Sequence, residues 1–160
     1  MAAVAGDAGG EARARARAVA GTFGAALALG ILLLLFFEPD VQQAEPAELV
    51  ARKDDARAFF AADYVFILLY AIASPFAISR FGAAHDGPNP WWLTAAVILL
   101  PLAGLVDATE NALLLSGTDS VSQDAVDFAH ALAIPKIALF VAGTACSIAV
   151  LVRAIRVLRG

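Results

Sequence analysis

The sequence has little of what a soluble metalloprotein or a nucleic-acid-binding protein requires. Cys146 is the only cysteine and lies inside an apolar run, so one chain can form neither an internal disulfide nor a thiolate metal cluster. Charged residues make up only 16% of the 160 residues, and the formal net charge is -4. Because no basic block occurs either, we exclude nucleic acid as a partner.

The common catalytic motifs of soluble enzymes are also missing. The sequence contains no G-x-x-x-x-G-K-[ST] phosphate loop, no H-E-x-x-H zinc motif, no G-x-S-x-G nucleophile elbow, and only two histidines. These absences exclude the chemistries that such motifs carry. The sequence predicts no particular cofactor or metal.

Apolar residues, by contrast, are abundant. They make up 61% of the chain, and the mean hydropathy is +0.76, whereas soluble domains contain roughly 45–50% apolar residues. About 20 apolar residues at 1.5 Å per residue match the ~30 Å hydrocarbon core of a bilayer. We therefore predict an all-α membrane protein, a four-transmembrane-helix bundle in one domain at residues 18–152, with the bilayer as its partner and spans at about 18–37, 58–79, 91–115 and 128–152.

The two ends of the chain are predicted to be tails. Residues 1–17 are rich in Ala, Gly and Arg without an apolar period and predict a flexible segment, and residues 153–160 predict a short basic tail. A cleaved signal peptide is the alternative for the first span, because three arginines precede it. That span is long for a signal peptide, however, and no convincing A-x-A cleavage site follows it.

The distribution of cations predicts the orientation. Seven of the eleven Lys and Arg residues fall on the side of the two termini, and only Arg52, Lys53 and Arg57 fall on the other side. Since cytoplasmic loops carry the excess of Lys and Arg, we predict a multi-pass protein of the cell membrane with both termini cytoplasmic. The opposite loops carry nine acidic residues against their three cations, which favours solvated loops over steering of cationic ligands.

Four ionisable residues interrupt the apolar spans: Asp63, Asp107, Glu110 and Lys136. Each charge at mid-membrane costs about 2.5–3.5 kcal/mol, so these groups need partners or water. We place three of them about 8–12 Å inside the outer ends of their helices, near the extracytoplasmic side. If all four were ionised, the cluster would have an excess of two negative charges. Protonated carboxyls, a bound cation or a cationic ligand would neutralise it.

Helical spacing predicts which side chains face the cluster. Gly104, Asp107, Glu110 and Asn111 share one face of the third span, and Asp63 and Tyr70 share a stripe of the second span, which Pro75 should kink. His130 lies about 120° from Lys136 in helical angle and is predicted to face elsewhere. The candidates for ligand binding or acid–base chemistry are Asp63, Asp107, Glu110, Asn111, Lys136, Tyr64 and Tyr70.

Several functions fit this pattern. A purely structural interpretation is a buried ion pair that fixes how the helices dock, but one ammonium cannot compensate three acids. The excess favours a site that binds or transports a cation, a proton, or a cationic or lipidic small molecule. One alternative is a membrane-embedded enzyme that acts on a lipid or isoprenoid-like substrate by carboxylate acid–base chemistry. Another is a structural subunit, and the small-residue faces around Gly21 and Gly24 suit a homo-oligomer.

Overall fold

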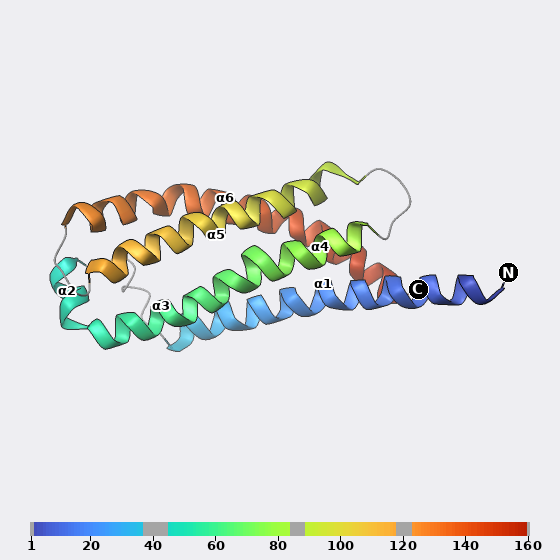
Figure 1. Cartoon of the computed structure of the whole chain (residues 1–160), viewed down its shortest axis with the longest axis horizontal. Helices are drawn as coiled ribbons and strands as arrows, with labels where there is room; N and C mark the ends of the chain where they lie inside the picture. The colour runs from blue at the N-terminus through green and yellow to red at the C-terminus, as the bar shows by residue number, and fades with distance from the viewer. Residues whose placement is uncertain (1, 37–44, 84–88, 118–122, 160) are drawn as a thin grey trace.

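The computed structural model describes residues 2–36, 45–83, 89–117 and 123–159 as an all-helical bundle (Figure 1). The described elements are α1 (Ala2–Phe36), α2 (Pro46–Ala51), α3 (Lys53–Ile67), the π-helix η2 (Leu68–Ala73), α4 (Ser74–Gly82), α5 (Trp91–Gly117) and α6 (Gln123–Arg159). α3, η2 and α4 run on as one long helix. Four helices are long and apolar enough to cross a membrane, which confirms the predicted four-span fold. Three of the nine predicted outer acids, Glu38, Asp40 and Asp119, lie outside the described residues.

The helices extend beyond the predicted spans. Residues 2–17, predicted to be a flexible tail, form the first turns of α1, and residues 153–159 continue α6. Alanine and arginine are strong helix formers. Arg15 forms an ion pair with Glu11 one turn away, and it also donates a hydrogen bond to the carbonyl oxygen of Arg80 at 3.0 Å. This hydrogen bond connects α1 to the end of α4 three residues before the predicted start of the first span.

The second span contains a π-helix directly before Pro75. The backbone N–H of Ser74 donates to the carbonyl oxygen of Leu69, five residues back, and the Ser74 hydroxyl donates to the same oxygen at 2.9 Å. Proline has no N–H and disrupts the preceding turn, so a wider turn forms there in place of the simple kink that the sequence predicts. π-Helical turns are frequent at functional sites. This one carries Tyr70, which is buried.

Two glycines allow close contact between helices. A Cβ on Gly104 would collide with the Cβ of Ala71, and a Cβ on Gly143 would lie 2.9 Å from Cδ2 of Leu100. α5 therefore packs closely against η2 on one side and α6 on the other. Gly21 and Gly24 have no atom within 4 Å of an added Cβ, so their use in a homo-oligomer stays a prediction.

The core differs between the two ends of the bundle. At the end where both termini lie, which we call the termini end, every long helix contributes buried residues: Ala16, Val19, Ala77, Ile78, Phe81, Leu93, Ala96, Val150 and Ala154. At the opposite end, which we call the α2 end, the cluster comes from α2, α3, α5 and α6. A third cluster lies between these two and consists of Ile67, Tyr70, Ala71, Leu100 and Ala103. None of the described α1 residues belongs to the cluster at the α2 end or to this third cluster. In Figure 1, α1 and α6 approach each other at the termini end and lie on opposite edges at the α2 end.

Candidate functional site

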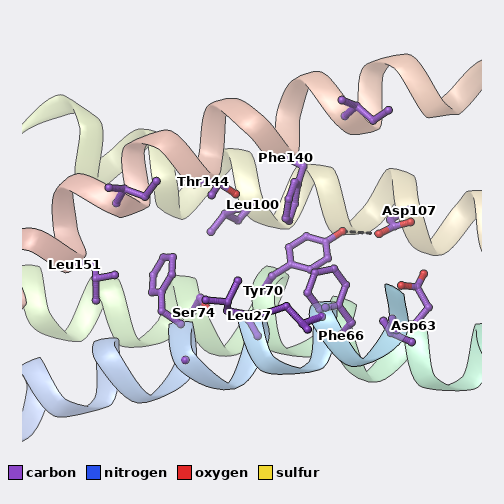
Figure 2. A pocket seen from close by; sticks show the side chains of 18 of the residues that line it. Leu27, Asp63, Phe66, Tyr70, Ser74, Leu100, Asp107, Phe140, Thr144 and Leu151 are labelled. Atoms are coloured by element: carbon purple, nitrogen blue, oxygen red, sulfur yellow. Dashed lines mark hydrogen bonds between the residues drawn. The ribbon is translucent and has the colours of Figure 1, made fainter. Parts of the chain in front are cut away.

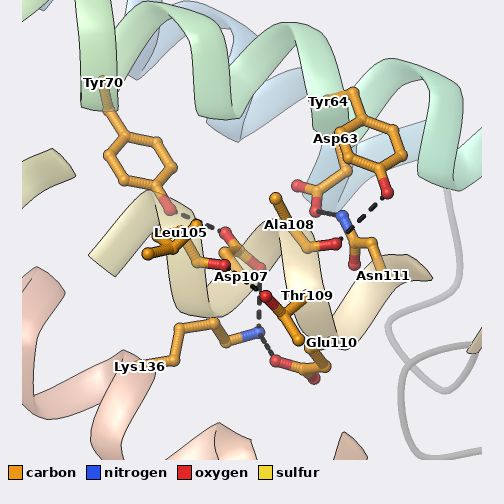
Figure 3. Close-up of polar contacts among 10 residues, drawn as sticks. All are labelled: Asp63, Tyr64, Tyr70, Leu105, Asp107, Ala108, Thr109, Glu110, Asn111 and Lys136. Carbon is orange, nitrogen blue, oxygen red and sulfur yellow. Dashed lines mark hydrogen bonds and ion pairs between the residues drawn. The ribbon is translucent and has the colours of Figure 1, made fainter. Parts of the chain in front are cut away.

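The ionisable residues of three helices meet inside the bundle (Figure 3). Nζ of Lys136, on α6, lies 3.2 Å from Oδ1 of Asp107 and 2.7 Å from Oε2 of Glu110, both on α5. Tyr70 donates a hydrogen bond of 2.8 Å from its hydroxyl to Oδ2 of Asp107. From α3, Asp63 accepts a hydrogen bond of 2.7 Å through Oδ2 from the amide nitrogen of Asn111. We call these six residues the polar cluster.

Tyr64 lies beside the polar cluster but does not join it through a side chain. Its hydroxyl donates a hydrogen bond of 3.2 Å to the carbonyl oxygen of Ala108. Tyr64 thus connects α3 to the backbone of α5. Of the seven candidates that the sequence predicts, four form one network around Lys136, Asp63 pairs with Asn111 beside it, and Tyr64 lies next to both.

The polar cluster contains more acid than base. Asp63, Asp107, Glu110 and Asn111 are all buried, and Lys136 is the one cation among the described residues that line the cavity beside them. Lys136 pairs with Asp107 and Glu110, whereas the partner of Asp63 is a neutral amide. Carboxylates removed from water need compensating charge. One ammonium leaves the site with a negative excess if all three acids are ionised.

Two buried polar atoms near the polar cluster have neither a hydrogen bond nor an ion pair among the described residues. They are Oδ1 of Asn111, whose residue is fully buried, and Nε2 of His130. His130 lies close enough to Glu110 to interact with it electrostatically, although the sequence predicts that it faces elsewhere. A lysine side chain is long enough to reach sideways across its helix, so residues with different helical angles can approach the same carboxylate.

A long cavity of about 880 Å³ begins at the polar cluster and runs along the bundle (Figure 2). Asp63, Asp107 and Lys136 line one end, and most of the remaining wall is apolar. The cavity walls on α1 and α6 include Leu27 and Ile137, which are 67% and 57% exposed. Such exposure indicates that the cavity opens along the gap between these two helices, towards lipid. The sequence offered no sign of this opening.

Three aromatic rings line the cavity next to the carboxylates. Phe66 and Phe140 each have their ring centroids 5.0 Å from that of Tyr70, and the Phe66 and Phe140 centroids are 6.2 Å apart. The Tyr70 and Phe140 planes are inclined by 82°. We call these residues the aromatic trio. Sequence reasoning selected only Tyr70, because phenylalanines are too common in membrane helices to stand out.

Asp63 and Asp107 lie at equal distances from their helix ends. Asp63 is ten residues from the start of α3, and Asp107 is ten residues from the end of α5. At 1.5 Å per residue, both lie about 15 Å from these helix ends. The depth of about 8–12 Å is counted from the ends of the apolar spans and stays a prediction. Among the described residues, no group of three or more His, Cys, Asp or Glu side chains could hold a metal ion.

These features define a four-span helical membrane protein with buried salt bridges between acidic residues and a lysine. No protein-family model matches the chain, and no curated protein or solved structure matches it either.

Proposed function

We propose that the protein binds an amphiphilic molecule with a cationic headgroup, which enters from the bilayer. The headgroup lies beside Asp63 and Asp107, and the apolar part extends along the cavity between α1 and α6. One observation carries this proposal: a single cavity is acidic at one end and apolar along the rest of its length. Its volume of about 880 Å³ is within the range of small-molecule sites, roughly 300–1,000 Å³.

The charge of the polar cluster favours a cation over an anion or a neutral headgroup. Asp63 has an amide partner in place of a cation, so it is the carboxylate that an incoming positive charge would compensate. Two unit charges 4 Å apart attract by about 4 kcal/mol at an effective dielectric constant of 20. A bound cationic headgroup would thus offset much of the cost of burying the carboxylates.

The apolar wall has a different role in a membrane from its role in water. Lipid tails are as apolar as leucine side chains, so moving an alkyl chain from the bilayer into the cavity gains little hydrophobic free energy. The chain keeps the molecule in the membrane, and the headgroup decides whether it binds. We therefore expect affinity to depend on the headgroup much more than on the length of the tail.

The proposed orientation places this site relative to the cell. With both termini cytoplasmic, as the distribution of arginines favours, the acidic end of the cavity is the end nearer the extracytoplasmic side. Transport of the bound molecule would use the same site.

Acid–base catalysis on a bound lipid is a second candidate function. The observation that favours it is the 2.8 Å hydrogen bond between the Tyr70 hydroxyl and Asp107, both of which line the cavity. A hydroxyl and a carboxylate at one wall are the groups that proton transfer requires. Incubation of the purified protein with lipid extracts would test this candidate, which requires a new product that Asp107→Asn abolishes.

Binding is tested with purified protein in lipid nanodiscs and a radiolabelled long-chain alkylamine. We expect saturable binding that weakens at least tenfold in Asp63→Asn, because the substitution removes a charge and keeps the shape of the side chain. Asp124→Asn is the matched control, because Asp124 is exposed on α6 and does not line the cavity. Equal binding by the wild type, Asp63→Asn and Asp107→Asn, with all three folded, would rule the proposal out.

A further inference from the structure

We infer that the aromatic trio selects an N-methylated ammonium headgroup without a phosphate, an inference that rests on the proposed function. Phe66, Tyr70 and Phe140 come from α3, η2 and α6, and all three line the cavity at the level of the carboxylates (Figure 2). The ligand class is therefore a lipophilic quaternary ammonium compound.

The positions of the three rings favour a cation beside them. The hydrogen bond of 2.8 Å from the Tyr70 hydroxyl to Asp107 places the Tyr70 ring directly beside that carboxylate. Phe140 contacts the Tyr70 ring at a steep angle, and Phe66 contacts both rings at intermediate angles. A cation held at the acidic end of the cavity therefore lies next to aromatic rings, whose faces attract cations within about 6 Å.

The surroundings of the carboxylates also favour a headgroup without N–H donors. Three of the four carboxylate oxygens of Asp63 and Asp107 already have one partner each, the Lys136 ammonium, the Tyr70 hydroxyl or the Asn111 amide, and most of the remaining cavity wall is apolar. A primary ammonium has three N–H donors, and each donor that it buries needs an acceptor. A trimethylammonium group has no donor to satisfy. It needs only negative potential and nearby aromatic rings, and the cavity lining includes both.

The charge of the polar cluster excludes zwitterionic phosphocholine headgroups. A phosphate next to the trimethylammonium group would bring negative charge close to three buried carboxylates. Lys136 is already paired with Asp107 and Glu110, so it has no remaining charge to compensate a phosphate. Like charges brought together in a desolvated site repel each other strongly.

The experiment compares three ligands with the same chain: hexadecyltrimethylammonium, hexadecylamine and hexadecylphosphocholine. Each displaces tritiated hexadecyltrimethylammonium from the full-length protein in nanodiscs, and affinities are corrected for partition into empty nanodiscs. We expect hexadecyltrimethylammonium to bind roughly tenfold more tightly than hexadecylamine, and hexadecylphosphocholine to bind more weakly than both.

Two variants separate the aromatic contribution from the hydrogen bonds. Phe140→Leu should remove most of the tenfold preference, because it should weaken hexadecyltrimethylammonium binding more than hexadecylamine binding, and thermal unfolding reports that the protein is folded. Tyr70→Phe keeps the ring but frees an oxygen of Asp107, so it should strengthen hexadecylamine binding more than hexadecyltrimethylammonium binding. Phe128→Leu is the matched control on α6, because Phe128 is exposed and does not line the cavity.

The outcomes distinguish this inference from the proposed function. Saturable binding of both amines with equal affinity would overturn the inference and leave the proposed function intact. Tight binding of hexadecylphosphocholine would overturn the exclusion of phosphate. Saturable binding of none of the three ligands would overturn the proposed function, and the inference with it.

Discussion

α1 and α6 are in contact at one end of the molecule and separated at the other. At the termini end, Ala16 and Val19 of α1 belong to the same buried cluster as Val150 and Ala154 of α6. Nearer the α2 end, residues of both helices line the cavity, as Leu27 and Ile137 do. The cavity therefore lies where α1 and α6 diverge.

The two regions also differ in what stabilises them. At the termini end, the buried cluster consists of apolar residues, and a hydrogen bond from Arg15 to the carbonyl oxygen of Arg80 lies beside it. The cavity region is held by ion pairs between Lys136 and two carboxylates and by close backbone approach at Gly104. Substitutions should therefore affect the two regions by different mechanisms, and with different magnitudes.

Removal of the ammonium should have the largest effect. Lys136→Met leaves Asp107 and Glu110 buried without their cation, and breaking a buried ion pair in this way costs about 3–5 kcal/mol. Thermal unfolding in detergent would measure the loss. Arg159→Met is the control on the same helix, because Arg159 is exposed at its end. A Lys136→Met protein as stable as this control would show that the ion pairs do not support the cavity region.

Close packing at Gly104 should give the next largest effect. Gly104→Ala forces η2 and α5 apart, because the new Cβ would overlap with that of Ala71, and overpacking costs about 1–3 kcal/mol. Gly24→Ala should be neutral or slightly stabilising, since no atom lies near an added Cβ there. Unfolding of the two variants in parallel would test the difference. Equal stability would contradict the close approach of η2 and α5.

Truncation of apolar side chains should give the smallest effect, and it compares the packing of the termini end with that of the cavity wall. Val150→Ala removes two methyl groups from the closed cluster, where the residue is fully buried, and should cost about 1 kcal/mol in lost packing. Ile148→Val on the cavity wall, where the residue is 52% exposed, should cost nothing measurable. A larger cost at Ile148 than at Val150 would mean that the gap between α1 and α6 is closed in the membrane.

The sequence predicts the polar cluster well because its signal is strong. Charged residues are rare in apolar spans, and the spacing of Asp107, Glu110 and Asn111 puts them on neighbouring faces of one helix. The four spans follow from length and hydropathy for the same reason. Function, orientation and oligomeric state stay predictions.

The cavity and the aromatic trio could not be predicted, for a physical reason. In a bilayer, both the lipid-facing and the protein-facing sides of a helix are apolar, so periodicity does not reveal which side packs. The divergence of α1 from α6 depends on crossing angles that one helix alone does not encode. Likewise, the π-helix before Pro75 and the proximity of His130 to Glu110 depend on tertiary contacts.

The most direct test of the proposed cavity site uses a long-chain alkyltrimethylammonium compound with a photoreactive diazirine in mid-chain. After irradiation in nanodiscs, mass spectrometry maps the adducts. The account predicts adducts on cavity residues such as Leu27 and Ile148, and their loss in Asp63→Asn. Equal labelling of lipid-facing residues outside the cavity, such as Val65 and Ile98, with no change in Asp63→Asn, would contradict it.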